Sequence, residues 1–144
     1  MAQSLLLSCS FATGEDELHS YAPSIDVASG PFVGMPEKEF TKEEIQLVVK
    51  QYGDAAKRCQ KAGIDIIEIH AGIGYMVMRF ISKYSNHRTD EYGGDTKGRC
   101  KLLTDIIDEI HKQCGEDYPM FVTLQTTLCP AVSALKTSRR SSRL

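Results

Sequence analysis

The stretch IDIIEIHAGIGYMVMRF, residues 64–80, decides the fold, because it joins a β-branched apolar run to a turn and a second apolar run. Ile64–Ile69 is short and mostly apolar, which is typical of a strand buried on both faces in a parallel sheet. The residues that follow predict a turn and a short helix. His70 is then the first residue after the strand, at the carboxyl end where α/β proteins bind their ligands.

Two long amphipathic helices are predicted around this strand. Thr41 and Glu44 have the spacing of a capping box, and apolar residues recur at helical spacing up to Gly63. Asp95 is a suitable N-cap for the second helix, which ends near Gly115. The apolar residues of the two faces are Ile45, Val48, Val49, Tyr52, Ala56, Cys59 and Ala62, then Leu102, Leu103, Ile106, Ile107 and Ile110.

A second buried strand is predicted at residues 118–124, so the order is helix, strand, helix, strand with short connections. That order indicates βα repetition around a parallel sheet. Residues 1–40, punctuated by proline and glycine, predict an irregular segment after a weak initial strand. Residues 41–124 form the predicted α/β core. Residues 125–144 have no cap and no apolar period, which predicts a disordered basic tail.

The composition of the 144 residues is that of one soluble globular domain, with 42% hydrophobic and 25% charged residues. The net charge is −2, and four cations lie within residues 136–143, so the rest of the chain is acidic and does not suit nucleic acid. The sequence has neither a signal-peptide pattern nor a run of about 20 apolar residues, so no membrane contact is expected.

Five scattered cysteines without a Cys-x-x-Cys pair indicate neither a disulfide framework nor a metal site. Free thiols of this kind are typical of a cytoplasmic protein. Three histidines, His19, His87 and His111, have no metal-ligand spacing to His70 and are expected at the surface.

Three motifs follow the first strand. Gly72 and Gly74 resemble a dinucleotide fingerprint, but Val77 stands where its third glycine is needed, so this motif is weak. His70 and Tyr75 bring two titratable donors to one loop, where they could form a site; a structural histidine beside a packing tyrosine is the alternative.

The segment SNHRTDEYGG, residues 85–94, predicts a compact hydrogen-bonded loop built on Asn86, Arg88 and Asp90. Gly93 and Gly94 then allow a tight turn with positive φ before the helix cap. This loop is expected to shape the site without taking part in chemistry.

The residues from GIDIIEIHAGIGY through RFIS to SNHRTDEYGG closely resemble the Old Yellow Enzyme family of FMN-dependent NAD(P)H oxidoreductases, the NADH:flavin oxidoreductases. The resemblance extends over residues 21–124. It implies a partial (β/α)8 barrel, from before the third barrel helix to the fifth strand. The strand at residues 64–69 resembles the family's fourth, and residues 120–124 its fifth.

The resemblance also implies a reaction, in which NADH or NADPH reduces FMN and the flavin passes hydride to an activated C=C bond. The implied substrate is a small enone or enoyl compound. By position, His70 resembles the donor to the substrate carbonyl and Tyr75 the proton donor. Fixed donors aimed at the developing enolate oxygen lower the barrier.

Departures from the family pattern indicate a limited activity. Ile73 stands where the family has a second donor, Thr123 stands where it has a flavin-contacting arginine, and Gln3 is a doubtful remnant of a third-strand cofactor segment. A complete barrel also needs about 250 residues. We therefore expect a truncated fragment that is weak or inactive alone and does not retain FMN. The alternative is a non-catalytic remnant or interaction module derived from such a barrel.

Overall fold

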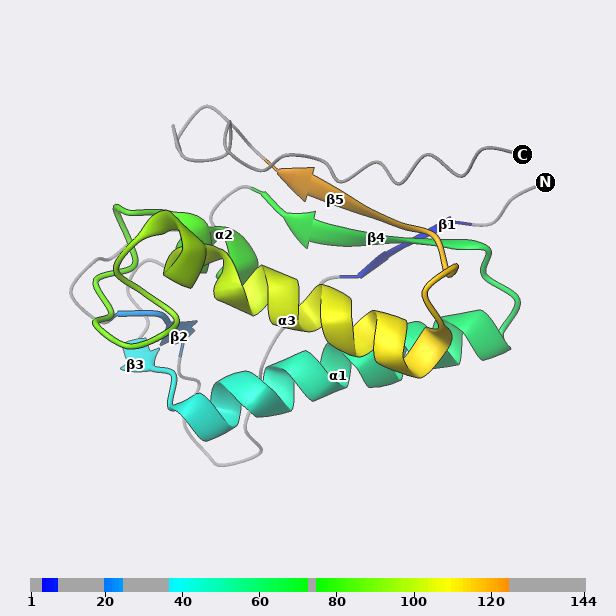
Figure 1. The fold of residues 1–144 in the computed structure, drawn as a ribbon, viewed down its shortest axis with the longest axis horizontal. Helices are drawn as coiled ribbons and strands as arrows, with labels where there is room; N and C mark the ends of the chain where they lie inside the picture. Colours follow the sequence, from blue (N-terminus) through cyan, green and yellow to red (C-terminus); the bar gives the residue numbers. More distant parts are fainter. Residues whose placement is uncertain (1–3, 8–19, 25–36, 73–74, 125–144) are drawn as a thin grey trace.

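The computed structural model describes residues 4–7, 20–24, 37–72 and 75–124 (Figure 1). Its elements, in chain order, are β1 (Ser4–Leu7), β2 (Ser20–Ala22), β3 (Glu37–Glu39), α1 (Lys42–Lys61), β4 (Ile66–Ala71), α2 (Met76–Ile81), α3 (Thr96–Cys114) and β5 (Met120–Leu124). Both long helices, the short helix and the two core strands are therefore confirmed. The predicted tail at residues 125–144 lies outside the described residues.

The helix boundaries follow from the predicted caps. Thr41 and Glu44 form the complete capping box of α1, in which each side chain binds the other residue's backbone N–H. Asp95 is the N-cap of α3, and its side chain accepts from the backbone N–H of Gly98; Gly115, with a φ of 98°, is the C-cap of the same helix. These contacts satisfy backbone donors that the first turn of a helix leaves without partners.

A three-stranded parallel sheet in the order β1-β4-β5 forms one layer, and α1 and α3 form the other. Figure 1 shows both helices on the same side of this sheet, running side by side. The short strands β2 and β3 pair with each other near the amino end of α1. The predicted parallel arrangement of βα units is confirmed.

The irregular segment predicted to follow a weak initial strand within residues 1–40 is wrong where β2 and β3 form. β1 pairs in parallel with β4, which confirms the weak initial strand of the prediction. β2 and β3 are three residues each, too short to leave an alternating pattern that could be recognised in the sequence.

The prediction that both core strands are buried on both faces is wrong for the described residues. In β4, Ile67, Ile69 and Ala71 are buried, whereas the alternate side chains are only half-buried. In β5 the alternate residues are exposed, with Phe121 at 63%. Successive side chains of a strand point to opposite faces, and among the described elements both long helices cover the same one. The apolar run could not reveal that asymmetry.

Two glycines in helices allow a contrasting prediction. A Cβ at Gly53 of α1 would lie 2.6 Å from the side-chain Nε2 of Gln113, which can move, whereas a Cβ at Gly98 of α3 would lie 2.0 Å from the backbone oxygen of Gly93. Helix propensity favours alanine by about 1 kcal/mol at an ordinary helix position. We expect Gly53→Ala to stay within about 1 kcal/mol of the parent chain, and Gly98→Ala to lose about 1–3 kcal/mol through overpacking.

Urea unfolding followed by circular dichroism measures both variants under identical conditions. Each change replaces one helical glycine with alanine, so each variant is the control for the other. Equal midpoints for the two variants would contradict the predicted contact between α3 and the backbone of the loop.

Candidate active site

His70 lies within the carboxyl end of β4 and is not the first residue after the strand. The strand begins two residues later than predicted and runs to Ala71. Ile64 lies just after the end of α1, where its backbone N–H donates to the Cys59 carbonyl at 3.0 Å and its carbonyl accepts from the Tyr118 hydroxyl at 2.9 Å. These bonds take Ile64 out of the sheet and shift the strand toward His70.

Tyr75 lies next to His70 and is the N-cap residue of α2. The centroids of the two rings are 5.0 Å apart at an interplanar angle of 65°, an edge-to-face contact typical of aromatic pairs. Tyr75 is 40% exposed and His70 is half-buried. The structure therefore brings together the two donors that the sequence singled out.

Thr123 is the register partner of His70 across β4 and β5. Its hydroxyl donates a hydrogen bond to Oε1 of Glu68, which is two residues before His70 and on the same face of β4. Glu68 in turn pairs with Phe121. His70, Thr123 and Glu68 thus share the face of the sheet that points away from α1 and α3.

Glu68 is the polar residue of this face that the sequence reasoning did not single out. The available signal was the period of two in a strand, which places Glu68 and His70 on one face as soon as β4 includes both. Because the predicted strand ended at Ile69, the sequence reasoning did not place His70 on the same strand face as Glu68. Gln3 and Ile73, the other residues considered, lie outside the described residues.

The pair of rings has the means to bind an oxygen and to transfer a proton. Within the described part of the chain, neither the imidazole of His70 nor the phenol of Tyr75 forms a hydrogen bond. An imidazole and a phenol are both hydrogen-bond donors and general acids. The arrangement suits a substrate with a carbonyl oxygen that gains negative charge.

Arg88 holds the loop at residues 85–94 in the way the sequence predicts. Its side chain is 6% exposed and forms a two-pronged ion pair with Asp90, at 3.0 Å from Nε and 2.6 Å from Nη2. Nη1 donates to the backbone carbonyls of Pro23 at 3.2 Å and Phe40 at 2.7 Å. One buried cation therefore connects the loop to the segments that contain β2 and β3.

Glycines close this loop for two different reasons. Gly94 has a φ of 69°, as predicted for the turn. Gly93 does not have a positive φ, which corrects the prediction for that residue; instead, a Cβ there would lie 2.1 Å from the backbone oxygen of Arg88. Close approach of two backbone segments thus excludes a side chain at Gly93.

Asp90 gives the loop a predictable response to acid. Hydrogen bonding by Arg88 holds the pKa of the Asp90 carboxyl below its usual value, and the backbone N–H of Tyr92 adds to this effect. A carboxyl with a depressed folded-state pKa contributes stability above its unfolded pKa of about 3.9, and this contribution is lost as the pH falls through the folded value. We therefore expect stability to fall in acid partly through Asp90.

Asp90→Asn tests this expectation. At neutral pH we expect the variant to lose about 1–3 kcal/mol, because Arg88 keeps its burial but loses a charged partner. Unfolding free energies measured from pH 7 down to pH 2 should show a shallower decline for the variant than for the parent chain. Parallel curves would show that Asp90 does not contribute to the acid response.

In the described ranges, no group of three or more histidine, cysteine or acidic side chains lies close enough to hold a metal ion. His87 is exposed in its loop and His111 lies on α3, while His19 is outside the described residues. Among the helices that the structure describes, none is long and apolar enough to cross a membrane.

Comparison with known proteins shows that this chain is similar to flavin oxidoreductases. Residues 13–130 match the model of the NADH:flavin oxidoreductase / NADH oxidase family. The cinnamate reductase of Clostridium sporogenes is 42% identical over 88 residues, which is 60% of this chain and 13% of that protein. The NADPH dehydrogenase of Bacillus subtilis is 45% identical over 89 residues, 62% of this chain and 26% of that protein.

A solved structure shows the same likeness in three dimensions. The Old Yellow Enzyme from Pichia sp. AKU4542 superposes with a TM-score of 0.64 at 36% identity, over 72% of this chain and 28% of that chain. The match to the two curated relatives thus spans about an eighth to a quarter of their length.

Proposed function

The chain belongs to the NADH:flavin oxidoreductase / NADH oxidase family. We propose that it contains the residues that bind the substrate carbonyl in an FMN-dependent NAD(P)H oxidoreductase of the ene-reductase type. The proposed substrate is a small enone or enoyl compound, and the proposed reductant is NADH or NADPH. Support comes from the names of two relatives, a cinnamate reductase and an NADPH dehydrogenase.

Family membership confirms the resemblance inferred from residues 21–124, and the match to an Old Yellow Enzyme structure confirms a partial (β/α)8 barrel. In that fold, active sites form at the carboxyl ends of the strands. His70 lies at that end of β4. The position of the candidate site therefore agrees with the general rule for the fold.

The edge-to-face contact between His70 and Tyr75 is the observation that carries the proposal. We propose that the imidazole of His70 donates a hydrogen bond to the substrate's carbonyl oxygen. This bond strengthens as the oxygen becomes an enolate, and so it favours the transition state over the ground state. The phenol of Tyr75 then gives its proton to the α-carbon, which requires the rings to keep their relative position.

The side chains of β4 and β5 do not fit a bound FMN. The cofactor carries a phosphate and gains negative charge on its ring system when reduced, so a site for it needs fixed positive charge. Neither β4 nor β5 contains a lysine or an arginine, and the carboxylate of Glu68 lies on the face that holds His70. Thr123, which stands where the family has an arginine, uses its hydroxyl to bind that carboxylate.

We accordingly expect the chain to leave a gel-filtration column without flavin absorbance after incubation with FMN. Thr123→Arg should lower the dissociation constant for FMN about tenfold or more, since a hydrogen bond to a charged group contributes about 1.5–3 kcal/mol. Thr123→Gln, of similar length without the charge, is the matched control. Stoichiometric flavin retained by the parent chain would contradict this prediction.

The proposed function is tested with reduced FMN supplied in solution as the hydride source and a small enone as substrate. Product is measured by chromatography, which detects rates too low for an absorbance assay. We expect the chain to form product faster than a protein-free mixture, at a low rate because Thr123 supplies no cation. A rate equal to that of the protein-free mixture would overturn the proposal.

A non-catalytic remnant or interaction module is the second candidate, and the hydrogen bond between Thr123 and Glu68 favours it. It predicts that the chain folds and adds nothing to the protein-free rate. A cytoplasmic location is proposed with either function, because Cys59, Cys100 and Cys114 are free thiols.

A further inference from the structure

The carboxyl end of α2 is held by side chains from the segment that follows it. Three consecutive backbone carbonyls, those of Arg79, Phe80 and Ile81, each accept a hydrogen bond. The donors are Oγ of Ser85 at 2.8 Å, Nδ2 of Asn86 at 2.6 Å and Nε of Arg99 at 3.1 Å. The last carbonyls of a helix have no partner within the helix, and a cation there also complements the helix dipole.

Asn86 is itself held in place from several sides. Its Nδ2 also donates to the Tyr92 carbonyl at 2.7 Å, and its Oδ1 accepts from the backbone N–H of Arg88 at 3.1 Å. The residue is 4% exposed. Asn86 therefore has one orientation in which all three bonds form, and that orientation directs Nδ2 to the end of α2.

Arg99 connects the same helix end to α3. Besides the Ile81 carbonyl, its guanidinium donates to the Gly94 carbonyl at 2.5 Å and to the Thr96 hydroxyl at 3.3 Å. The residue is 6% exposed. A planar guanidinium with several partners resists rotation more than a single ammonium group does.

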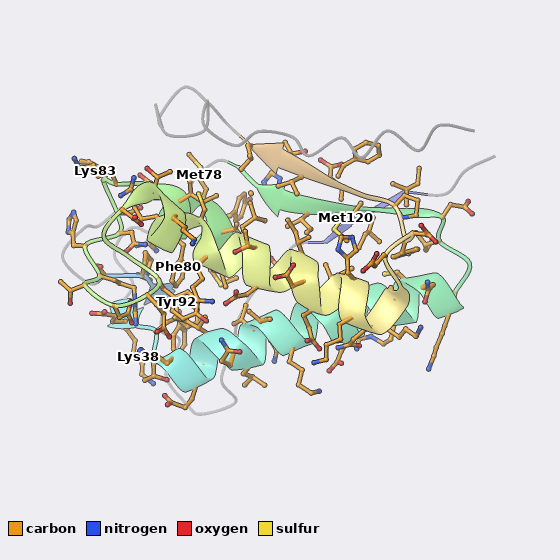
Figure 2. All side chains as sticks on the ribbon, in the orientation of Figure 1. Lys38, Met78, Phe80, Lys83, Tyr92 and Met120 are labelled. Carbon is orange, nitrogen blue, oxygen red and sulfur yellow. The ribbon has the colours of Figure 1, made fainter. Side chains whose placement is uncertain are left out.

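Tyr75 lies at the opposite end of α2, six residues before Ile81. The helix has six residues, and its first backbone hydrogen bond runs from the Arg79 N–H to the Tyr75 carbonyl at 2.9 Å. Figure 2 shows Met78 and Phe80 of this helix at the end of the molecule where Tyr92 lies. Because α2 is short, a shift or rotation of its carboxyl end moves the Tyr75 ring relative to His70, which is fixed in β4.

We propose that Asn86 and Arg99 are positioning residues that set the Tyr75 phenol against the His70 imidazole by anchoring the carboxyl end of α2. The value of this geometry for proton transfer rests on the proposed function. The geometry itself does not, and it is measured without turnover.

NMR of the His70 imidazole protons provides the test, because the ring current of Tyr75 displaces their resonances. Tyr75→Leu, which removes the aromatic ring, gives the undisplaced reference. Asn86→Asp removes both Nδ2 donors and keeps the oxygen that accepts from Arg88. Arg99→Lys keeps the positive charge but loses the planar guanidinium with its several N–H donors. We expect both variants to lose most of the displacement at temperatures well below their Tm.

Tyr92→Phe is the matched control, because it disturbs the same loop without touching α2. The Tyr92 hydroxyl accepts from Gln46 at 2.5 Å and donates to Asp105 at 2.9 Å, so its loss lowers stability, while the backbone carbonyl still accepts from Asn86. We expect a lower Tm with the full His70 displacement. A role in stability alone would move only the Tm in all three variants.

The proposal is overturned if Asn86→Asp and Arg99→Lys keep the displacement of the parent chain. If Asn86→Asp does not fold, the displacement of the His70 resonances in Arg99→Lys alone tests the proposal. If the variants lose the displacement but the parent chain forms no product from an enone, the proposed function is refuted and the positioning role stands. The two failures are therefore distinguishable.

Discussion

Arg88→Ala is expected to lose about 3–5 kcal/mol of unfolding free energy, the usual cost of removing one partner from a buried ion pair. The side chain donates five hydrogen bonds: two to Asp90, one to Glu39 and two to the carbonyls of Pro23 and Phe40. Truncation removes one donor from each of the two carbonyls and leaves the Asp90 carboxylate with the backbone N–H of Tyr92 but without its charged partner. A domain has only about 5–15 kcal/mol in total, so the variant should be close to unfolding at 25 °C.

Urea unfolding at pH 7 measures this loss, with two comparison variants. Arg88→Lys keeps the positive charge but not the planar guanidinium, so its unfolding free energy should lie between those of Arg88→Ala and the parent chain. Lys50→Ala removes an exposed ion pair with Asp54 four residues along α1, for which we expect no more than about 0.5 kcal/mol. An Arg88→Ala midpoint equal to that of Lys50→Ala would show that the loop does not depend on the arginine.

The loop and the helices were predictable because their determinants are local. Thr41 with Glu44, and Asp95 with Gly98, are contacts between residues three apart, so the helix starts can be recognised in the sequence itself. The polar residues of the 85–94 loop likewise bind within a few positions, as Asn86 does with the N–H of Arg88. Short-range patterns of this kind need no knowledge of the rest of the fold.

The candidate site was predictable only in part, because its remaining contacts join distant residues. The register that pairs His70 with Thr123, and the bond from Thr123 to Glu68, span more than 50 residues. The boundary of β4 also depended on the bond from the Tyr118 hydroxyl to the Ile64 carbonyl, which joins residues 54 positions apart. Sequence reasoning therefore found the two donors but not the carboxylate beside them.

His70→Ala and Tyr75→Phe are expected to remove different parts of the proposed chemistry. Loss of one donor to the developing oxyanion costs about 10²–10³ in rate, so His70→Ala should bring the protein-dependent rate close to that of the protein-free mixture. Loss of a positioned general acid costs about 10²–10⁴, and Tyr75→Phe removes the proton while leaving the ring. Tyr84→Phe, at a residue that is 73% exposed, is the matched control and should keep the rate.

Deuterium labelling separates a proton donor from a ring that only packs. In D₂O, a proton delivered by Tyr75 enters the α-carbon of an α-substituted enone from one side, so the parent chain should give one stereoisomer. Tyr75→Phe leaves protonation to solvent, which reaches both faces, so its remaining product should be a mixture. A Tyr75→Phe product with the stereochemistry of the parent chain would exclude Tyr75 as the donor, because the side of delivery would then be set by another group on the face that holds His70.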